Sequence, residues 1–271
     1  MGAQVYESHR AILGRVSKIA AVNTVDVIAA YRFVNLDDLP ALRQRLFDQA
    51  QALGILGTVL LAPEGINFNL AGTPAAMDTF MAALRSDARF ATLELKRHRA
   101  DKPPFRRLFV KIKREIIRMN ETGVVPAAGR APAVNAATLA RWLQAGHCDE
   151  GRPVVMLDTR NAFEVDAGAF DHAADWRISK FSDFPQALAE HRADLQGKTV
   201  VSYCTGGIRC EKAAIWMQQQ GLQHVLQLDG GILRYFEDAP GAPGWHGRCV
   251  VFDDRQSLDT ALHGQPAGVH A

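Results

Sequence analysis

The part of this 271-residue chain most able to do chemistry is a short cysteine loop. The loop reads Cys204-Thr205-Gly206-Gly207-Ile208-Arg209. It follows an apolar run, 199–203, that is typical of a strand, and a helix is expected to start at about Cys210 to Lys212. Glycines let successive backbone N–H groups point inward, and such groups at a helix N-terminus stabilise an anion. The natural anion is the sulfur of Cys204, as thiolate or persulfide, and the same field should depress its pKa.

Arg209 either adds a fixed positive charge to this loop or closes it by hydrogen bonds. Its spacing from Cys204 is Cys-x4-Arg, whereas cysteine-type protein phosphatases use Cys-x5-Arg. One residue adds at most ~3.6 Å of reach, so the shorter loop should suit a terminal sulfur better than a phosphate. The alternative is a buried cysteine that acts as a small hydrophobic residue. The coincidence of strand end, glycines and arginine favours a reactive Cys204 in an intracellular enzyme.

The elements around the loop predict an α/β fold with a parallel sheet. Short apolar runs at 154–158, 199–203 and 224–228 alternate with helical stretches, one of them at 211–220. Such runs are typical of strands that are buried on both faces. Parallel sheets bind their ligands beyond the carboxyl ends of the strands, which is where Cys204 falls. Gly230-Gly231 is interpreted as a backbone turn.

The first half of the chain predicts a different domain. The periodicity indicates strands at 27–34, 56–61, 66–70 and 92–97 and helices at 37–53 and 73–84. This βαββαβ order is the ferredoxin-like (acylphosphatase-like) α+β plan. We therefore expect an N-terminal arm (1–25), a ferredoxin-like domain (26–118), a linker rich in glycine and proline (119–135), the α/β domain that holds the cysteine loop (136–245) and a C-terminal segment (246–271).

The bulk composition excludes several classes of protein. Hydrophobic residues make up 48% and charged residues 22% of the chain, as in ordinary globular proteins. The four cysteines have no zinc spacing, and the nine histidines form no metal-binding set; His172 and His224 are expected at the surface or in loops. We predict no metal, no evident cofactor, no membrane span, no secretory signal, no disulfide framework and a cytoplasmic location.

A basic stripe suggests a polyanionic partner. Residues 96–118 hold ten basic and two acidic side chains, a net charge of +8 that leaves −6 for the rest of a chain whose total is +2. Clustered charge of this kind fits nucleic acid, although a solvated strand and loop would also account for it. The candidate RNA-binding residues are Lys96, Arg97, Arg99, Arg106, Arg107, Lys111, Lys113 and Arg114.

Further motifs carry a resemblance to one family. Val155 to Asn161 with Glu164, and Leu228-Asp229-Gly230-Gly231-Ile232, are similar to the entry motif and final turn of rhodanese domains. The segments 204–213, 63–67 (Pro-Glu-Gly-Ile-Asn) and 245–255 resemble one rhodanese subgroup, the oxygen-dependent tRNA uridine hydroxylases, from about Val27 to Arg255. The segment 166–176 departs from the usual pattern. Relatives often carry a longer C-terminal extension with paired cysteines. This sequence has no such pair near its end, so no metal-bound tail is expected here.

The resemblance implies an oxidoreductase of monooxygenase type that makes 5-hydroxyuridine at the tRNA wobble position with molecular oxygen. It implies a catalytic role for Cys204, Arg209 and Cys210, with Thr205 to Ile208 as the active-site loop. Cys210 would be a redox partner of Cys204 or only a small residue in the first helical turn. The partner would be tRNA, with no stable protein partner. The cysteine loop alone supports a sulfurtransferase with a Cys204 persulfide equally well, and a non-catalytic rhodanese-like module is a third hypothesis.

Overall fold

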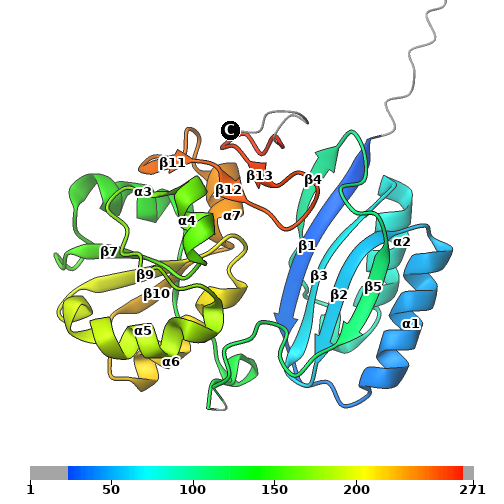
Figure 1. The fold of residues 1–271 in the computed structure, drawn as a ribbon, viewed down its shortest axis with the longest axis horizontal. Coiled ribbons are helices and arrows are strands. Elements are labelled where there is room, and N and C mark those ends of the chain that lie inside the picture. The colour runs from blue at the N-terminus through cyan, green and yellow to red at the C-terminus, as the bar shows by residue number, and fades with distance from the viewer. Residues whose placement is uncertain (1–23, 122, 265–271) are drawn as a thin grey trace, which may run out of the picture.

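The computed structural model describes residues 24–121 and 123–264. The expected N-terminal arm, apart from its last two residues, and the end of the C-terminal tail lie outside these described residues. Two domains lie side by side, joined by a linker at the bottom of Figure 1. The C-terminal segment crosses between them at the top of the same view.

The N-terminal domain is ferredoxin-like, as predicted. Its elements are β1 (Val25–Phe33), α1 (Leu39–Ala52), β2 (Leu56–Ala62), β3 (Gly65–Gly72), α2 (Pro74–Arg85), β4 (Lys96–Ala100) and β5 (Leu108–Ile112). The strand order is β4-β1-β3-β2-β5, and β5 pairs in parallel with β2 at the edge. Both helices cover the face of the sheet that points away from the second domain (Figure 1).

Alternation along β1 gives the two faces of this sheet different roles. Ile28 and Ala30 point into the core between the sheet and its helices. Val27, Ala29 and Tyr31 lie on the opposite face, because successive side chains of a strand point to opposite sides, and they line the space between the domains. The helix-free face is therefore available to form one wall of a site.

The start of β4 differs from the prediction. The sequence predicts a strand at 92–97, whereas ladder pairing with β1 begins only at Lys96, opposite Ala29, and runs to Ala100. The preceding residues, 92–95, leave the sheet and line a pocket between the domains. Apolar alternation in this segment reflects the burial of Leu93 in the core rather than strand pairing.

The second domain is built on a four-stranded parallel sheet with the order β6-β10-β9-β7. Its strands are β6 (Ala133–Val134), β7 (Val154–Asp158), β9 (Thr199–Tyr203) and β10 (Val225–Leu228). The helices are α3 (Ala136–Ala145), α4 (Ala162–Ala167), α5 (Phe184–His191), α6 (Ile208–Gln219) and α7 (Gly231–Asp238). Separate apolar clusters cover the two faces, one with α3 and α7 and the other with α5 and α6. This is the predicted rhodanese-like α/β arrangement.

Short strands complete this domain. Two residues assigned to the linker from sequence, Ala133 and Val134, form β6 and pair with β10. The remaining strands are β8 (Gly168–Phe170), β11 (Trp245–Gly247), β12 (Cys249–Val250) and β13 (Ser257–Leu258). β11 pairs with β8 and β12 with β13. This pairing fastens the start of the C-terminal segment to the rhodanese-like domain.

Buried charge ties the two domains together. Lys212 of α6 is 1% exposed, and its Nζ lies 2.7 Å from a carboxylate oxygen of both Glu64 and Glu115. The C-terminal segment adds a backbone bond, since the N–H of Asp254 donates to the carbonyl of Pro104 at 3.0 Å. No helix in the described part of the chain is both long and apolar enough to cross a membrane.

Candidate active site

The cysteine loop turns backbone N–H groups toward the sulfur of Cys204. β9 ends at Tyr203, and α6 begins at Ile208 with Gly207 as its N-cap, at φ +96°. That left-handed backbone suits glycine and few other residues. It lets the N–H of Gly207 donate to Sγ of Cys204 at 3.1 Å, and the N–H of Arg209 also donates to this sulfur.

The N-terminus of α7 holds the carbonyl groups of the loop. The N–H groups of Ile232 and Leu233 donate to the carbonyls of Cys204 and Thr205 at 3.0 and 3.2 Å. The close approach requires a glycine at 231, where a Cβ would lie 2.5 Å from the Cys204 oxygen. With its carbonyls engaged on this side, the loop presents its N–H groups to the sulfur.

Arg209 both closes the cysteine loop by hydrogen bonds and adds a positive charge beside Cys204. Its guanidinium forms two hydrogen bonds to Glu164, at 2.7 and 2.8 Å, which fasten the loop to α4. Burial raises the pKa of the Cys204 thiol, but a hydrogen bond from Cys210, the charge of Arg209 and the two backbone N–H groups outweigh it. The net result is a pKa well below the ordinary thiol range, which favours the thiolate form of Cys204.

Cys210 is the hydrogen-bond donor to this thiolate. Burial and the bond to Cys204 both raise the pKa of Cys210 well above the ordinary thiol range. Both cysteines are buried and free rather than linked. The structure thus brings together the three predicted catalytic residues, Cys204, Arg209 and Cys210.

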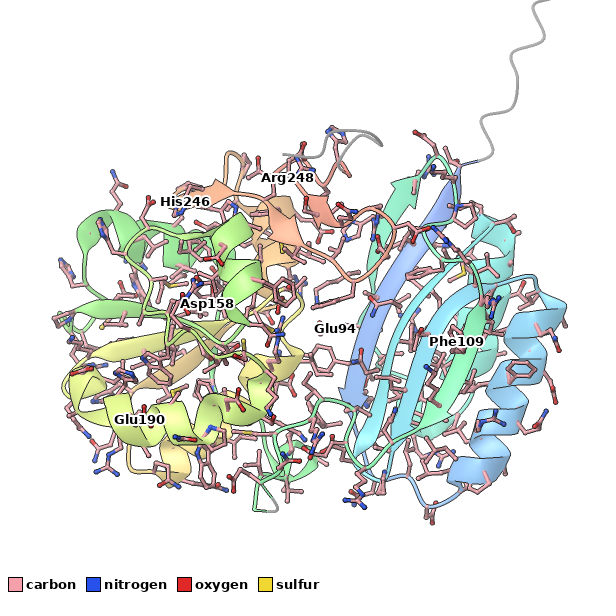
Figure 2. The ribbon with its side chains drawn as sticks, in the orientation of Figure 1. Glu94, Phe109, Asp158, Glu190, His246 and Arg248 are labelled. Carbon is pink, nitrogen blue, oxygen red and sulfur yellow. The ribbon has the colours of Figure 1, made fainter. Side chains whose placement is uncertain are left out.

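A buried ion pair between Asp158 and Arg160 supports the cysteine loop indirectly. Asp158 ends β7 inside the rhodanese-like domain (Figure 2), and its carboxylate accepts from Arg160 at distances down to 2.6 Å. Arg160 is fully buried and also donates to the carbonyls of Glu164 and Gly168. The Asp158–Arg160 ion pair therefore positions Glu164, the residue whose carboxylate binds Arg209.

Cys204 forms part of the wall of a pocket of about 490 Å³ between the domains. Cys204 itself has no solvent exposure, although it is among the residues that line this pocket. Most of its lining comes from the helix-free face of the N-terminal sheet, the cysteine loop with 180–182, and the C-terminal segment at 251–253 and 255; Ile117, Arg118, Asn161 and Leu233 complete it. The lining includes Val27, Ala29, Tyr31, Asn67, Asn69, Lys96, His98, Cys204, Thr205, Gly206, Ile208, Arg209, Val251, Phe252 and Arg255.

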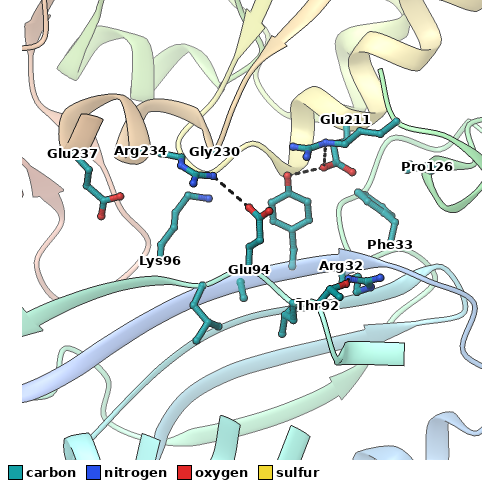
Figure 3. Close-up of a pocket in the computed structure, with 15 residues that line it drawn as sticks. Arg32, Phe33, Thr92, Glu94, Lys96, Pro126, Glu211, Gly230, Arg234 and Glu237 are labelled. Carbon is teal, nitrogen blue, oxygen red and sulfur yellow. Dashed lines mark hydrogen bonds and ion pairs between the residues drawn. The ribbon is translucent and has the colours of Figure 1, made fainter. Parts of the chain in front are cut away.

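A second pocket of about 570 Å³ between the domains (Figure 3) shares Ala30, Tyr31 and Lys96 with the first one. The hydroxyl of Tyr31 donates to Glu211 at 2.9 Å, and Glu211 pairs with Arg130 at the same distance. Nζ of Lys96 donates to the Gly206 carbonyl at 2.7 Å. The ferredoxin-like domain therefore contacts the cysteine loop directly.

His98 is a site residue that sequence reasoning missed. It lies two residues after Lys96 on the same face of β4, and its side chain is 8% exposed. Burial, together with the charges of Arg255 and Lys96, lowers its pKa to about 4, so the ring is neutral near pH 7. Nδ1 faces Glu237 at 3.6 Å, while the buried Nε2 has no partner among the described residues. The sequence signal for this position was the alternation of side chains along a strand, which places His98 on the same face as Lys96.

The predicted basic stripe does not form one surface. Lys96 lies between the domains, whereas Arg97 points to the helix-covered face and pairs with Asp26 and Asp78 at 2.7 Å each. Arg106 pairs with Asp254 at 3.4 Å. The remaining five side chains are exposed: Arg99, Arg107, Lys111, Lys113 and Arg114.

The other sequence-derived candidates are peripheral. His172 is exposed, and His224 is half-buried just before β10. In the described ranges, 24–121 and 123–264, no cluster of three or more histidine, cysteine or acidic side chains has the arrangement of a metal site.

Comparison with known proteins gives matches over both domains. The UPF0176 acylphosphatase like domain model matches residues 25–116, and the rhodanese-like domain model matches 136–238. A tRNA uridine(34) hydroxylase from Variovorax paradoxus is 60% identical over 244 residues, covering 90% of this chain and 92% of that protein. One from Bordetella avium is 61% identical over 235 residues, covering 87% of this chain and 97% of that protein. A solved human single-domain sulfurtransferase is 22% identical, covering 40% of this chain and 97% of its own, with a TM-score of 0.33. The chain belongs to the tRNA uridine(34) hydroxylase family.

Proposed function

We propose that this protein hydroxylates C5 of the wobble uridine of tRNA with molecular oxygen, and that Cys204 is the reactive group. The observation that carries the proposal is a buried cysteine, Cys204, whose sulfur accepts a backbone N–H bond at 3.1 Å and which lines a pocket of about 490 Å³, in a chain about 60% identical to named hydroxylases. Small-molecule sites span ~300–1,000 Å³, so the pocket has room for a nucleobase. A cytoplasmic location, where tRNA and reduced thiols are found, belongs to the same proposal.

The role of the thiolate follows from the electronics of uracil. C5 of uracil is a poor nucleophile toward oxygen, but addition of a thiolate at C6 turns C5 into an enolate carbon. Cys204 is a suitable nucleophile because its environment keeps it deprotonated. Elimination of Cys204 after C5 is oxygenated restores the aromatic base. This chemistry makes the enzyme an oxidoreductase of monooxygenase type.

The two cysteines also balance the electrons. Inserting one oxygen atom at C5 and releasing the other as water requires two electrons and two protons. Oxidation of the Cys204 thiolate and the Cys210 thiol to a disulfide supplies both electrons and one proton, and solvent supplies the second proton. Uridine, O₂, the thiolate, the thiol and one proton thus become 5-hydroxyuridine, water and one disulfide. An external dithiol reductant then regenerates the pair by exchange. The electrostatic coupling between these two free, buried cysteines supports this role for Cys210.

The test is nucleoside mass spectrometry of tRNA from cells that lack this gene. Loss of wobble 5-hydroxyuridine, restored by the wild-type gene and not by Cys204→Ser, is the expected result. Unchanged 5-hydroxyuridine in cells without a redundant pathway would refute the hydroxylase. The inward N–H groups of the loop would also hold a persulfide, so sulfur transfer from thiosulfate to cyanide is measured on the same protein. Rapid transfer without hydroxylation would favour the sulfurtransferase alternative.

A further inference from the structure

Two exposed phenylalanines form a pair outside the cysteine loop. Phe163 lies in the first turn of α4 and is 53% exposed, and Phe252, just after β12, is 67% exposed. Their ring centroids are 6.4 Å apart with planes at 84°, an edge-to-face contact. In such a contact one ring keeps both of its faces free for other neighbours.

The position of this pair connects it to the site. Phe252 lines the pocket that contains Cys204, and Phe163 contacts Phe252 from α4, the helix that holds Arg209 through Glu164. The other large apolar side chains that are exposed in the described part of the chain, Phe109, Ile112 and Val125, do not line this pocket. Figure 2 shows Phe109 on the ferredoxin-like domain, on the edge strand β5.

Positive charge accompanies the aromatic pair. Arg118 and Lys180 are exposed and line the same pocket, Arg118 from the end of the first domain and Lys180 from the second. Nζ of Lys180 lies 3.7 Å from Asp183, with 70% of its side chain exposed. The mouth of the pocket thus combines ring faces with two cations, which is the composition that single-stranded nucleic acid binds through stacking and phosphate contacts.

We infer that Phe163 and Phe252 are the stacking platform for the RNA loop that delivers the target base. A base next to the reacting uridine stacks on this aromatic pair, and Arg118 and Lys180 contact the phosphates on either side. The inference deepens the proposed function and rests on it for the identity of the substrate. Apart from Arg118, the last basic residue of the stripe at 96–118, it assigns RNA positioning to residues that lie outside that stripe.

The test is binding of an anticodon stem-loop RNA to the full-length protein without oxygen, so that no turnover occurs. Phe252→Ala and Phe163→Ala should each raise Kd about 5- to 100-fold, the usual effect of losing one base–aromatic stack. KM for tRNA should rise with it. Phe252→Trp should keep Kd within a few fold of wild type, and Phe252→Leu should behave like alanine because it restores apolar area without a ring. Phe109→Ala, an exposed ring outside the pocket, is the matched control and should leave Kd unchanged.

Two further measurements separate the possible outcomes. Lys180→Gln and Arg118→Gln should each reduce the slope of log Kd against log salt by about 0.7, as expected for one phosphate contact with a single strand. Wild-type Kd and KM in Phe163→Ala and Phe252→Ala, with unchanged thermal unfolding, would overturn the inference even while 5-hydroxyuridine forms. Loss of self-association in these variants, with RNA binding intact, would also overturn it. RNA binding that depends on Phe252 in a protein that makes no 5-hydroxyuridine would uphold the platform and refute the hydroxylase.

Discussion

The ammonium group of Lys212 lies 2.7 Å from the carboxylate of Glu64, and this contact joins the two domains next to the reactive loop. Glu64 belongs to the Pro-Glu-Gly turn before β3, while Lys212 follows Cys204 by eight residues on α6. Glu115 completes the arrangement at 2.7 Å. Two motifs that are far apart in sequence therefore meet in one buried ion cluster.

Removing Lys212 should destabilise the protein strongly. Lys212→Met leaves Glu64 and Glu115 facing each other without a cation, and we expect a loss of about 3 kcal/mol in the free energy of unfolding. Urea unfolding followed by tryptophan fluorescence measures it, because all four tryptophans lie after residue 141. The exposed Lys102 is the control, and Lys102→Met should change stability by less than about 0.5 kcal/mol. Equal stability of the two variants would contradict a structural role for the cluster.

Cys204 should remain a thiolate at pH values well below the ordinary thiol pKa of about 8.5. Because its folded pKa is the lowered one, the thiolate persists as pH falls and is lost only when pH passes through that lower value. Thiolate absorbance in the ultraviolet, taken as the difference from Cys204→Ser, gives the titration. Cys210→Ala removes the thiol that donates to Cys204 and should move the curve to higher pH. Cys249→Ala, which removes another buried thiol, should leave it in place.

Oxidation of the cysteine pair should accompany turnover. In one turnover with tRNA and oxygen but no reductant, we expect a Cys204–Cys210 disulfide in the same amount as 5-hydroxyuridine, detected by peptide mass spectrometry. Cys210→Ser should stop this turnover, whereas Cys249→Ser should support it. Product without any disulfide would show that the electrons come from elsewhere.

Gly231 and Gly206 should respond very differently to alanine. At Gly231 φ is +70° and a Cβ would lie 2.5 Å from the Cys204 carbonyl oxygen, so Gly231→Ala should cost more than about 2 kcal/mol and distort the loop. At Gly206 the nearest atom to a Cβ is Nζ of Lys96 at 3.8 Å. Gly206→Ala should therefore keep stability within about 0.5 kcal/mol. Chemical denaturation and the Cys204 thiolate titration check both variants, and equal effects would contradict the close packing of α7 on the loop.

Substitutions at Lys96 and its neighbour Arg97 should distinguish an effect on the reaction rate from an effect on RNA binding. Lys96→Met removes the charge-assisted bond to Gly206 and should lower the single-turnover rate at saturating tRNA about 10- to 100-fold. Its Kd for tRNA and the salt dependence of Kd should not change. Arg97→Met, on the helix-covered face, should leave the rate and the Kd unaltered. A weaker Kd with a normal rate in Lys96→Met would instead favour the phosphate-binding role predicted from the basic stripe.

Local features of the site could be predicted from sequence, and contacts between the domains could not. The position of Cys204 at the end of a buried strand and the glycines after it are encoded within one segment. Alternation along β4 separates Lys96 and His98 from Arg97, but it does not show what each face meets. That depends on the cysteine loop approaching the helix-free sheet, a long-range arrangement set by contacts such as Lys212 with Glu64. For the same reason the stripe at 96–114 was read as one surface, although its members point in different directions.

Tyr31 and Lys96 are the wall common to the two pockets between the domains. A compound that enters the larger pocket and displaces either side chain would withdraw the support of Gly206 and change the shape of the chamber around Cys204. Such a compound would inhibit without occupying the place of the RNA. The pocket of about 570 Å³ is therefore a place, outside the one that Cys204 lines, from which the shape of the active site depends on two side chains.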